Sequence, residues 1–515
     1  MLKKSIIIFF LLLSKLISAQ GFKVRHFPTT SSDNLGLYIE EKSPGKYFAG
    51  GFINDTIGGK ADFRLCVMEL NSTGQINWIK KYGSSKFMYL NNPFIARWFY
   101  KLGSNFMFTG CVYDSIVNKY IGVLIKFNAN GDTLWQKKYQ SIDTLEDVIP
   151  QRVTAGTDGG FLITGFFQHW GDHSRKLMLI KTDAFGNELW RKKIQKNNPN
   201  VQDGKAILQD SASKKIVIGG FQYINSNLDT YINFTICDSV GNFILNWAMS
   251  QGAITDLKQT NDKKIIACGR KEYLQTNAAG DNYNRAFAFK FDINNPYAII
   301  WKIDGFDSLK VINIFNSIEE LNDGSILFGG TTERIDGFHG NNIIRISKFD
   351  ANSNLIWNKY YDYKINGANQ DNNQSMVCLT KTSDGVMIGA IPSINNDMPN
   401  PFFFVKYDAN GCDTTLAYCN TLLFDNVLQK ENSLFTVFPN PAHDFIYLQF
   451  IGQQSKHLYK ITITNCIGEL QLNLNANPSL QNNQIVNIGL LKSGIYLLQL
   501  WENDKMISTQ KLIKN

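Results

Sequence analysis

Two residue patterns recur along the chain at the same spacing, and they constrain its fold more than any other feature of the sequence. The first is an apolar strand, an Asx/Gly turn and a tryptophan strand, with its tryptophans at Trp78, Trp135, Trp190, Trp247, Trp301 and Trp357. The second is a turn, a short apolar run and a glycine, and it ends at Gly51, Gly110, Gly165, Gly220, Gly269, Gly330 and Gly389. Both have a period of about 56 residues, and random composition would rarely produce two independent patterns with one period. The chain therefore contains seven copies of one structural unit.

One copy of the unit predicts four short strands. In the third copy, the apolar-rich runs occupy residues 148–155, 160–167, 176–182 and 188–194. Tight Asp/Gly turns between such runs are typical of antiparallel hairpins. A four-stranded sheet of this kind cannot bury both faces alone, whereas seven in series can close into a ring. We therefore predict an all-β fold, a seven-bladed β-propeller followed by a small immunoglobulin-like β-sandwich. An open solenoid or an array of sandwiches is the alternative.

The recurring glycine and tryptophan each have a predicted place in this fold. We expect the glycine where sheets crowd together near a central axis, because a strand glycine often marks a close approach of another backbone. We expect the tryptophan between neighbouring blades, where a large ring buries much surface. The competing interpretation of the tryptophans is a set of sugar-stacking platforms.

The two ends of the repeat region predict how the ring closes. Residues 22–27 (FKVRHF) are similar to the fourth strand of the other copies but precede the first copy. The last copy ends in residues 412–419 (CDTTLAYC), where a tryptophan strand is due. If Cys412 and Cys419 form a disulfide, this segment cannot be a regular strand, since seven strand residues span ~23 Å and a disulfide allows ~4.4–6.8 Å between Cα atoms. We therefore expect the N-terminal strand to complete the last blade.

Residues 1–19 are predicted to be a secretory signal peptide. Lys3 and Lys4 precede the apolar run SIIIFFLLL, and Ala19 offers a small residue at the cleavage site. The alternative is a membrane anchor, but Lys15 interrupts the run well short of the ~20 residues that a spanning helix needs. No cysteine follows the leader to carry a lipid. We expect the mature protein to be exported and not integral to the membrane.

A different module follows the repeats. Residues 420–432 are a predicted linker between the propeller of residues 20–419 and a module of residues 433–515, whose seven or so alternating strands predict a small sandwich. The module carries a Pro-Asn-Pro motif, two Gly-containing turns and a basic-apolar ending, represented by Pro439, Asn440, Pro441, Gly468, Gly494, Tyr496 and Lys511. In this order the features strongly resemble the type A C-terminal sorting domain of the type IX secretion system of Bacteroidota. Cys466 stands where an aromatic or polar residue is more usual.

The resemblance covers this module and the leader, and it implies a route of secretion rather than a biochemical activity. It implies folding in the periplasm, recognition of the module by the outer-membrane translocon, and its removal by a sortase. The rest of the chain would then be released or attached to lipopolysaccharide at the cell surface. The alternative is an ordinary immunoglobulin-like accessory domain. The repeats are similar to those of other secreted β-propeller proteins of Bacteroidota, which carries fold but not activity.

The sequence offers little catalytic chemistry, and we assign no catalytic, cofactor or metal residues. No G-x-S-x-G, H-E-x-x-H or P-loop motif occurs. His169 and His173 flank Asp172 in one loop and could bind a metal, but we favour a solvated loop because nothing fixes their mutual geometry. Turns such as the one at Asp350 mimic calcium loops but lack the distal glutamate, so we expect hairpin turns. A net charge of +8 on 515 residues, partly from leader lysines, gives no nucleic-acid footprint.

Long, variable loops predict where a ligand would bind. The connections between second and third strands, and between blades, are longer than the tight hairpin turns and open on one face of a propeller. Their aromatic residues are the candidate ligand face: Trp170, Tyr223, Tyr273, Tyr283 and Phe338. We expect a non-enzymatic binding or adhesion propeller with a glycan or protein ligand. The alternative is an exoenzyme that acts on polysaccharide or peptide. It would carry a pair of carboxyl groups about 5–9.5 Å apart at the mouth of the central funnel of the propeller.

Overall fold

The chain divides into two compact units, and both consist of β-strands. The computed structural model describes residues 21–514 except 30–33, 55–62, 84–86, 90–97, 172–173, 195–200, 224–229, 277–281, 307–311, 334–341, 364–372, 385–386, 395–399, 414, 416–434, 439, 441, 451–458, 466–468, 477–482 and 503–504. The units are Met1–Cys419 and Asn420–Asn515. No helix occurs among the described residues, which confirms the all-β prediction. The predicted leader and linker lie outside the described residues.

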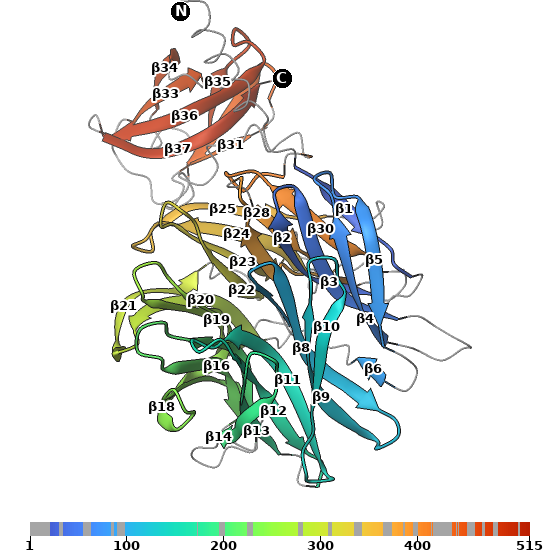
Figure 1. Ribbon diagram of the computed structural model, residues 1–515. Coiled ribbons are helices and arrows are strands. Elements are labelled where there is room, and N and C mark those ends of the chain that lie inside the picture. The colour runs from blue at the N-terminus through green and yellow to red at the C-terminus, as the bar shows by residue number, and fades with distance from the viewer. Residues whose placement is uncertain are drawn as a thin grey trace, which may run out of the picture. The chain divides into compact units, whose positions relative to one another are not determined.

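The strands of the first unit pair in seven successive four-stranded groups, which we call blades 1 to 7 (Figure 1). Blades 1 to 3 are formed as follows: β2 (Leu35–Ser43), β3 (Lys46–Asn54), β4 (Phe63–Leu70) and β5 (Ile76–Tyr82); β7 (Phe99–Leu102), β8 (Asn105–Asp114), β9 (Lys119–Phe127) and β10 (Thr133–Tyr139), with β6 (Phe87–Tyr89) also on β8; β11 (Glu146–Ala155), β12 (Phe161–His169), β13 (Arg175–Thr182) and β14 (Glu188–Ile194). All of these pairs are antiparallel, as the short turns require.

Blades 4 and 5 share one long strand, β18, whose first part ends blade 4 and whose last part begins blade 5. The remaining strands of blades 4 to 7 are β15 (Val201–Gln209), β16 (Ile216–Tyr223), β17 (Thr230–Cys237) and β18 (Phe243–Gln259); β19 (Ile265–Thr276), β20 (Asn282–Asp292) and β21 (Asn295–Phe306); β22 (Asn313–Glu320), β23 (Ile326–Glu333), β24 (Asn342–Phe349) and β25 (Leu355–Tyr361); β27 (Cys378–Lys381), β28 (Met387–Ala390), β30 (Phe402–Tyr407) and β1 (Lys23–His26). A small pair, β26 (Asn373–Gln374) and β29 (Ser393–Ile394), flanks blade 7.

The N-terminal strand closes the ring. β1 pairs with β30 in antiparallel register from Lys23↔Val405 to His26↔Phe402, and blade 1 lies beside blade 7 (Figure 1). Phe22 and Val24 lie against Gly74 of blade 1, and Nε2 of His26 lies 2.8 Å from the Gly74 carbonyl oxygen. The prediction that this strand completes the last blade is therefore confirmed. Cys419 lies outside the described residues, so the Cys412–Cys419 disulfide stays a prediction.

Five of the six recurring tryptophans join neighbouring blades, as predicted, and the side chain of Trp247 lies outside the described part. The rings of Trp78, Trp135, Trp190 and Trp357 each lie against the glycine in the last turn of the following blade, at Gly131, Gly186, Gly241 and Gly411. Nε1 of Trp301 donates to the Ala351 carbonyl in the same turn of blade 6. At the closure Phe22 takes the place of a tryptophan against Gly74. One contact therefore repeats between successive blades, with a phenylalanine at the closure.

The recurring glycine has a different reason from the one we expected. The register of five first strands shifts by one residue at a β-bulge, at Leu37, Gln151, Lys205, Thr255 and Asn316. Opposite each bulge a first-strand carbonyl oxygen approaches the glycine, and a Cβ there would lie 1.9–2.1 Å from it at Gly51, Gly165, Gly220, Gly269 and Gly330. The close approach is thus within one sheet, not between sheets at the axis, because the bulge pushes the strand toward its partner.

Alanine at Gly220 is expected to lower the stability of the propeller. Its Cβ would lie 1.9 Å from the Asp203 carbonyl oxygen, so the two strands must separate, at a cost of about 1–3 kcal/mol. The thermal midpoint of unfolding measures this. Gly159→Ala is the control, because a Cβ at Gly159 meets nothing within 4 Å and only its φ of +86° opposes the change. Equal losses for the two variants would contradict the bulge explanation.

The turns that resemble calcium loops are hairpin turns, as predicted. Oδ1 of Asp350 accepts the backbone N–H groups of Asn352 and Asn354 at 2.9 and 2.7 Å, and Oδ2 accepts Nδ2 of Asn354 at 2.8 Å. The same pattern occurs at Asp183 and Asp238. Such Asx turns place the next residues in a tight reversal, and both carboxylate oxygens are occupied within the turn.

A lysine of the third strand binds an aspartate of the first turn in several blades, for example Lys348 and Asp323 at 3.1 Å. Hydrogen bonds from the hydroxyl and backbone N–H of Ser325, with this ion pair, lower the pKa of Asp323 from 3.8 to about 2. A depressed pKa in the folded state contributes stability above the unfolded pKa, and that contribution disappears as the pH falls through the folded pKa.

The difference in thermal midpoint between the wild type and Asp323→Asn is therefore expected to depend on pH in one direction. It should be constant near neutral pH, shrink from about pH 4 downward, and vanish below about pH 2. Ser325→Ala removes the largest cause of the shift and should weaken the dependence. A difference that stays constant from pH 7 to pH 2 would contradict this account.

The second unit is a small two-sheet domain. One sheet contains β31 (Phe435–Phe438), β32 (Phe445–Phe450) and β35 (Asn483–Asn487), and the other contains β34 (Leu470–Ala476), β33 (Tyr459–Asn465), β36 (Gly494–Glu502) and β37 (Lys505–Lys514). Side chains alternate between the two faces of each strand, so those that point inward from both sheets form one buried cluster, which includes Leu448, Ile463 and Leu498.

Candidate functional site

Trp170 is the best-placed residue of the predicted ligand face. It follows β12, its side chain is 52% exposed, and its Nε1 donates to Oδ2 of Asp147 at 2.8 Å. Asp147 is buried at the start of β11, where desolvation raises its pKa although Trp170 and the Tyr120 N–H donate to it. The hydrogen bond to Asp147 thus holds the indole in place while about half of Trp170 stays exposed.

The other residues of that face are only partly described. Tyr223 is half-buried at the end of β16, with its ring 5.6 Å from that of Phe221. Tyr273 and Tyr283 are opposite each other across β19 and β20, and their side chains lie outside the described part. Phe338 lies outside the described residues. The structure therefore brings Tyr273 and Tyr283 together, and the ligand face stays a prediction.

The metal alternative has no described site. His169 Nε2 lies 3.6 Å from Oδ2 of Asp143, whereas Asp172 and His173 lie outside the described residues. Among the side chains that the structure places, no group of three His, Cys, Asp or Glu residues could hold a metal ion.

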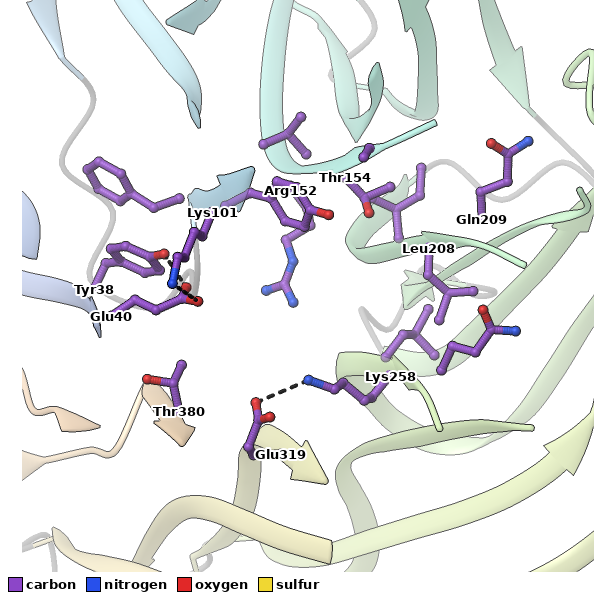
Figure 2. Close-up of a pocket in the computed structure, with 17 residues that line it drawn as sticks. Tyr38, Glu40, Lys101, Arg152, Thr154, Leu208, Gln209, Lys258, Glu319 and Thr380 are labelled. Atoms are coloured by element: carbon purple, nitrogen blue, oxygen red, sulfur yellow. Dashed lines mark hydrogen bonds and ion pairs between the residues drawn. The ribbon is translucent and has the colours of Figure 1, made fainter. Parts of the chain in front are cut away.

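A cavity lies at the C-terminal ends of the first strands (Figure 2), whereas Trp170 lies near the N-terminal end of β11. It has a volume of about 360 Å³, and residues of all seven first strands line it, such as Glu40 of β2, Arg152 of β11 and Thr380 of β27. These residues immediately precede the tight turns to the second strands. Because the start of β11 pairs with the end of β12, at Glu146↔His169, the long loops after the second strands lie at the opposite end.

Ion pairs join most of the charged side chains that line the cavity. Lys258 Nζ lies 3.1 Å from Oε2 of Glu319, and Lys101 Nζ lies 3.9 Å from Oε1 of Glu40 (Figure 2). The Tyr38 hydroxyl donates to Oε2 of Glu40. Each pair joins first strands of adjacent blades, so side chains from separate sheets fix one another around the cavity.

A third ion pair crosses the ring beneath the cavity. Nη2 of Arg152, in blade 3, lies 2.5 Å from Oδ1 of Asp256, in blade 5. Asp256 also accepts the backbone N–H groups of Leu257 at 3.0 Å and Ile318 at 2.9 Å. The corresponding residue of the intervening blade 4 is Ala206, which is fully buried and leaves room for the pair. Both charged side chains are at least nine-tenths buried.

This cavity was not predicted from the sequence, because the long loops were favoured over the ends of the first strands. A signal was present, since Arg152 and Asp256 are charged residues next to the apolar Val153 and Leu257 in first strands. Aligning the seven copies would have placed them at one level of the ring. The sequence could not show that these two side chains meet across blade 4, because their distance depends on the diameter of the ring.

The sorting-domain residues that are described lie around the last strand of the second unit. Nδ2 of Asn440 donates to the Lys511 carbonyl at 2.6 Å, and its Oδ1 accepts the Ile513 N–H at 2.8 Å. Gly494 pairs with Lys514, and the Tyr496 hydroxyl donates to the Lys492 carbonyl at 2.8 Å. The Pro-Asn-Pro motif and the basic-apolar ending are therefore joined through Asn440. Pro439, Pro441 and Gly468 lie outside the described residues.

Comparison with known proteins identifies the second unit. Residues 436–515 match the family described as the secretion system C-terminal sorting domain. No curated protein matches the chain. No helix long and apolar enough to cross a membrane occurs in the part that the structure describes.

Several solved structures are similar to this chain at 8–9% identity. The β-propeller domain of the trilobed protease from Pyrococcus furiosus is 9% identical, with 75% of this chain and 98% of that chain covered and a TM-score of 0.39. The acylaminoacyl peptidase of Pyrococcus horikoshii is 8% identical, with 83% and 61% covered and a TM-score of 0.42. A protein of unknown function from Bacteroides caccae is 9% identical, with 61% and 94% covered and a TM-score of 0.35. With the sorting domain and the strand pairing described above, the chain is a secreted cargo of the type IX secretion system with a β-propeller fold.

Proposed function

We propose that the propeller is a non-enzymatic binding or adhesion module, delivered to the cell surface or released after export. The observation that carries this is the pairing of the cavity carboxylates, since Glu40 and Glu319 each face a lysine of the neighbouring blade. Ion-paired carboxylates on rigid strands suit recognition of a ligand, because their lysine partners hold them in a fixed geometry. The fixed, exposed indole of Trp170 offers a second contact surface at the opposite end.

The export part of the proposal rests on the sorting domain. We propose that a signal peptide at residues 1–19 directs the chain to the periplasm and that a sortase removes the second unit at the outer membrane. Deletion of residues 436–515 should leave the chain in the periplasm, whereas the full chain should reach the surface or the medium. Fractionation and immunoblotting of the producing cells measure this. Equal export of both forms would contradict it.

The binding part is tested by presenting the secreted propeller to a glycan array and a protein panel, alongside a broad hydrolase panel. Binding without hydrolysis supports the proposal. An exoenzyme is the second candidate, and the observation that favours it is that two carboxylates, Glu40 and Glu319, line one cavity. Hydrolysis that Glu319→Gln abolishes, with an unchanged thermal midpoint, would establish the second candidate instead.

A further inference from the structure

The cavity at the ends of the first strands has two different walls. The aliphatic side chains of Ile207, Leu208 and Leu257, on β15 and β18, form the more apolar wall, and Gln209, Lys258 and Gln259 of the same strands border it. Glu40 and Thr380 lie across the cavity from Leu208, on strands β2 and β27 (Figure 2). A volume of about 360 Å³ is within the range of small-molecule sites. The cavity therefore suits a small ligand with one aliphatic and one polar side.

The charges of the lining favour a ligand that carries both a carboxylate and N–H donors. Lys101, Arg152 and Lys258 line the cavity as cations, Glu40 and Glu319 line it as anions, and Asp256 pairs with Arg152 beneath it. The three cations and three anions balance, so the site suits a ligand without excess charge better than a phosphate dianion. Guanidinium and ammonium groups both bind a carboxylate through charge-assisted hydrogen bonds.

The carboxylates of the lining require that the ligand also carry N–H donors. Glu40 and Glu319 can accept N–H groups from a ligand, and both lie on strands other than those that form the apolar wall. We propose that this cavity binds an aliphatic α-amino acid unit, with its carboxylate at Arg152 and Lys258 and its side chain against Leu208 and Leu257. This rests on the proposed binding function and names its ligand. The unit is either a free amino acid or the C-terminal residue of a peptide, because both carry an α-carboxylate, an N–H donor on the α-nitrogen and the aliphatic side chain.

Calorimetric titration of the full secreted chain tests the proposal. The probes are L-leucine, the peptide Gly-Gly-Leu, its C-terminal amide, acetate and inorganic phosphate. At least one of L-leucine and Gly-Gly-Leu should bind, and the amide should bind roughly tenfold or more weakly than Gly-Gly-Leu because a charge-assisted contact is lost. Binding of L-leucine identifies a free amino acid, and binding of Gly-Gly-Leu alone identifies a peptide end. No binding of either, equal binding of the amide where the peptide binds, or equal binding of phosphate overturns the proposal.

Variants place the binding in this cavity. Arg152→Gln should abolish it, but this change also removes a buried ion pair and can prevent folding. Lys258→Gln is the second variant, because the Lys258 side chain is one-third exposed and its loss removes one of the two cations proposed to contact the ligand carboxylate; we expect about a tenfold weaker affinity. Lys302→Gln, on the exposed side of β21, is the matched control and should leave the affinity unchanged. An unchanged affinity in a folded Lys258→Gln protein overturns the proposal. A positive glycan array with blank titrations overturns this inference alone and leaves the binding function standing.

Discussion

Deletion of residues 21–27 from the exported chain, with the leader kept, is expected to cause a large loss of propeller stability. The change removes β1, which supplies the fourth strand of blade 7. It also removes Phe22, which is 4% exposed, packs at 5.5 Å from the ring of Tyr47 and accepts the Lys406 N–H at 2.8 Å. The buried side chain of Phe22, the half-buried side chain of Val24 and several ladder hydrogen bonds together contribute about 5 kcal/mol or more.

The same deletion leaves β30 as an unpaired edge, so aggregation of the variant is also expected. Scanning calorimetry and size-exclusion chromatography of the exported protein measure both effects. Phe22→Ala is the graded control, since it removes only the ring that lies against Gly74 and should cost about 3 kcal/mol. A deletion variant that is monomeric with the wild-type thermal midpoint would contradict closure by β1.

Asp256→Ala is expected to destabilise the propeller by about 3–5 kcal/mol, because it leaves the buried guanidinium of Arg152 without its carboxylate. It also removes the acceptor of the Leu257 and Ile318 N–H groups. Denaturant unfolding followed by tryptophan fluorescence measures the loss.

A double variant separates the two causes. Arg152→Met with Asp256→Leu replaces the ion pair with apolar side chains of similar size, and it should recover much of the stability that Asp256→Ala loses. Arg152→Met alone should be more destabilising than the double variant, since it leaves the Asp256 carboxylate buried without its guanidinium. If the double variant is as unstable as the sum of the single ones, the charge pairing is not what stabilises this level of the ring.

The repeats explain why much of the fold could be predicted. The tryptophan and glycine patterns recur at contacts that recur, and residues 22–27 had the pattern of a fourth strand that they form in the structure. The role of the glycine was predicted wrongly because a bulge leaves no mark in the hydrophobic pattern. Its cause is a register shift at residues such as Lys205, which only the strand pairing reveals.

The site was less predictable than the fold. The long loops stood out by length and aromatic content, yet the described cavity lies at the other end of the first strands, among residues such as Arg152 and Lys258. Each lies in a different strand, and only the closed ring brings seven strand ends to one cavity. A local pattern predicts a blade, whereas the cavity is a property of the whole ring.

The most direct test of the account is whether the exported propeller binds a ligand and leaves it intact. The exported protein is incubated for a long period with a ligand that it binds, and the ligand that it retains is then eluted and analysed by mass spectrometry. The Lys258→Gln and Lys302→Gln proteins are treated in parallel. The account predicts that wild-type and Lys302→Gln proteins return an unaltered ligand and that Lys258→Gln retains little of it. Recovery of a cleaved product from the wild-type protein would contradict the account.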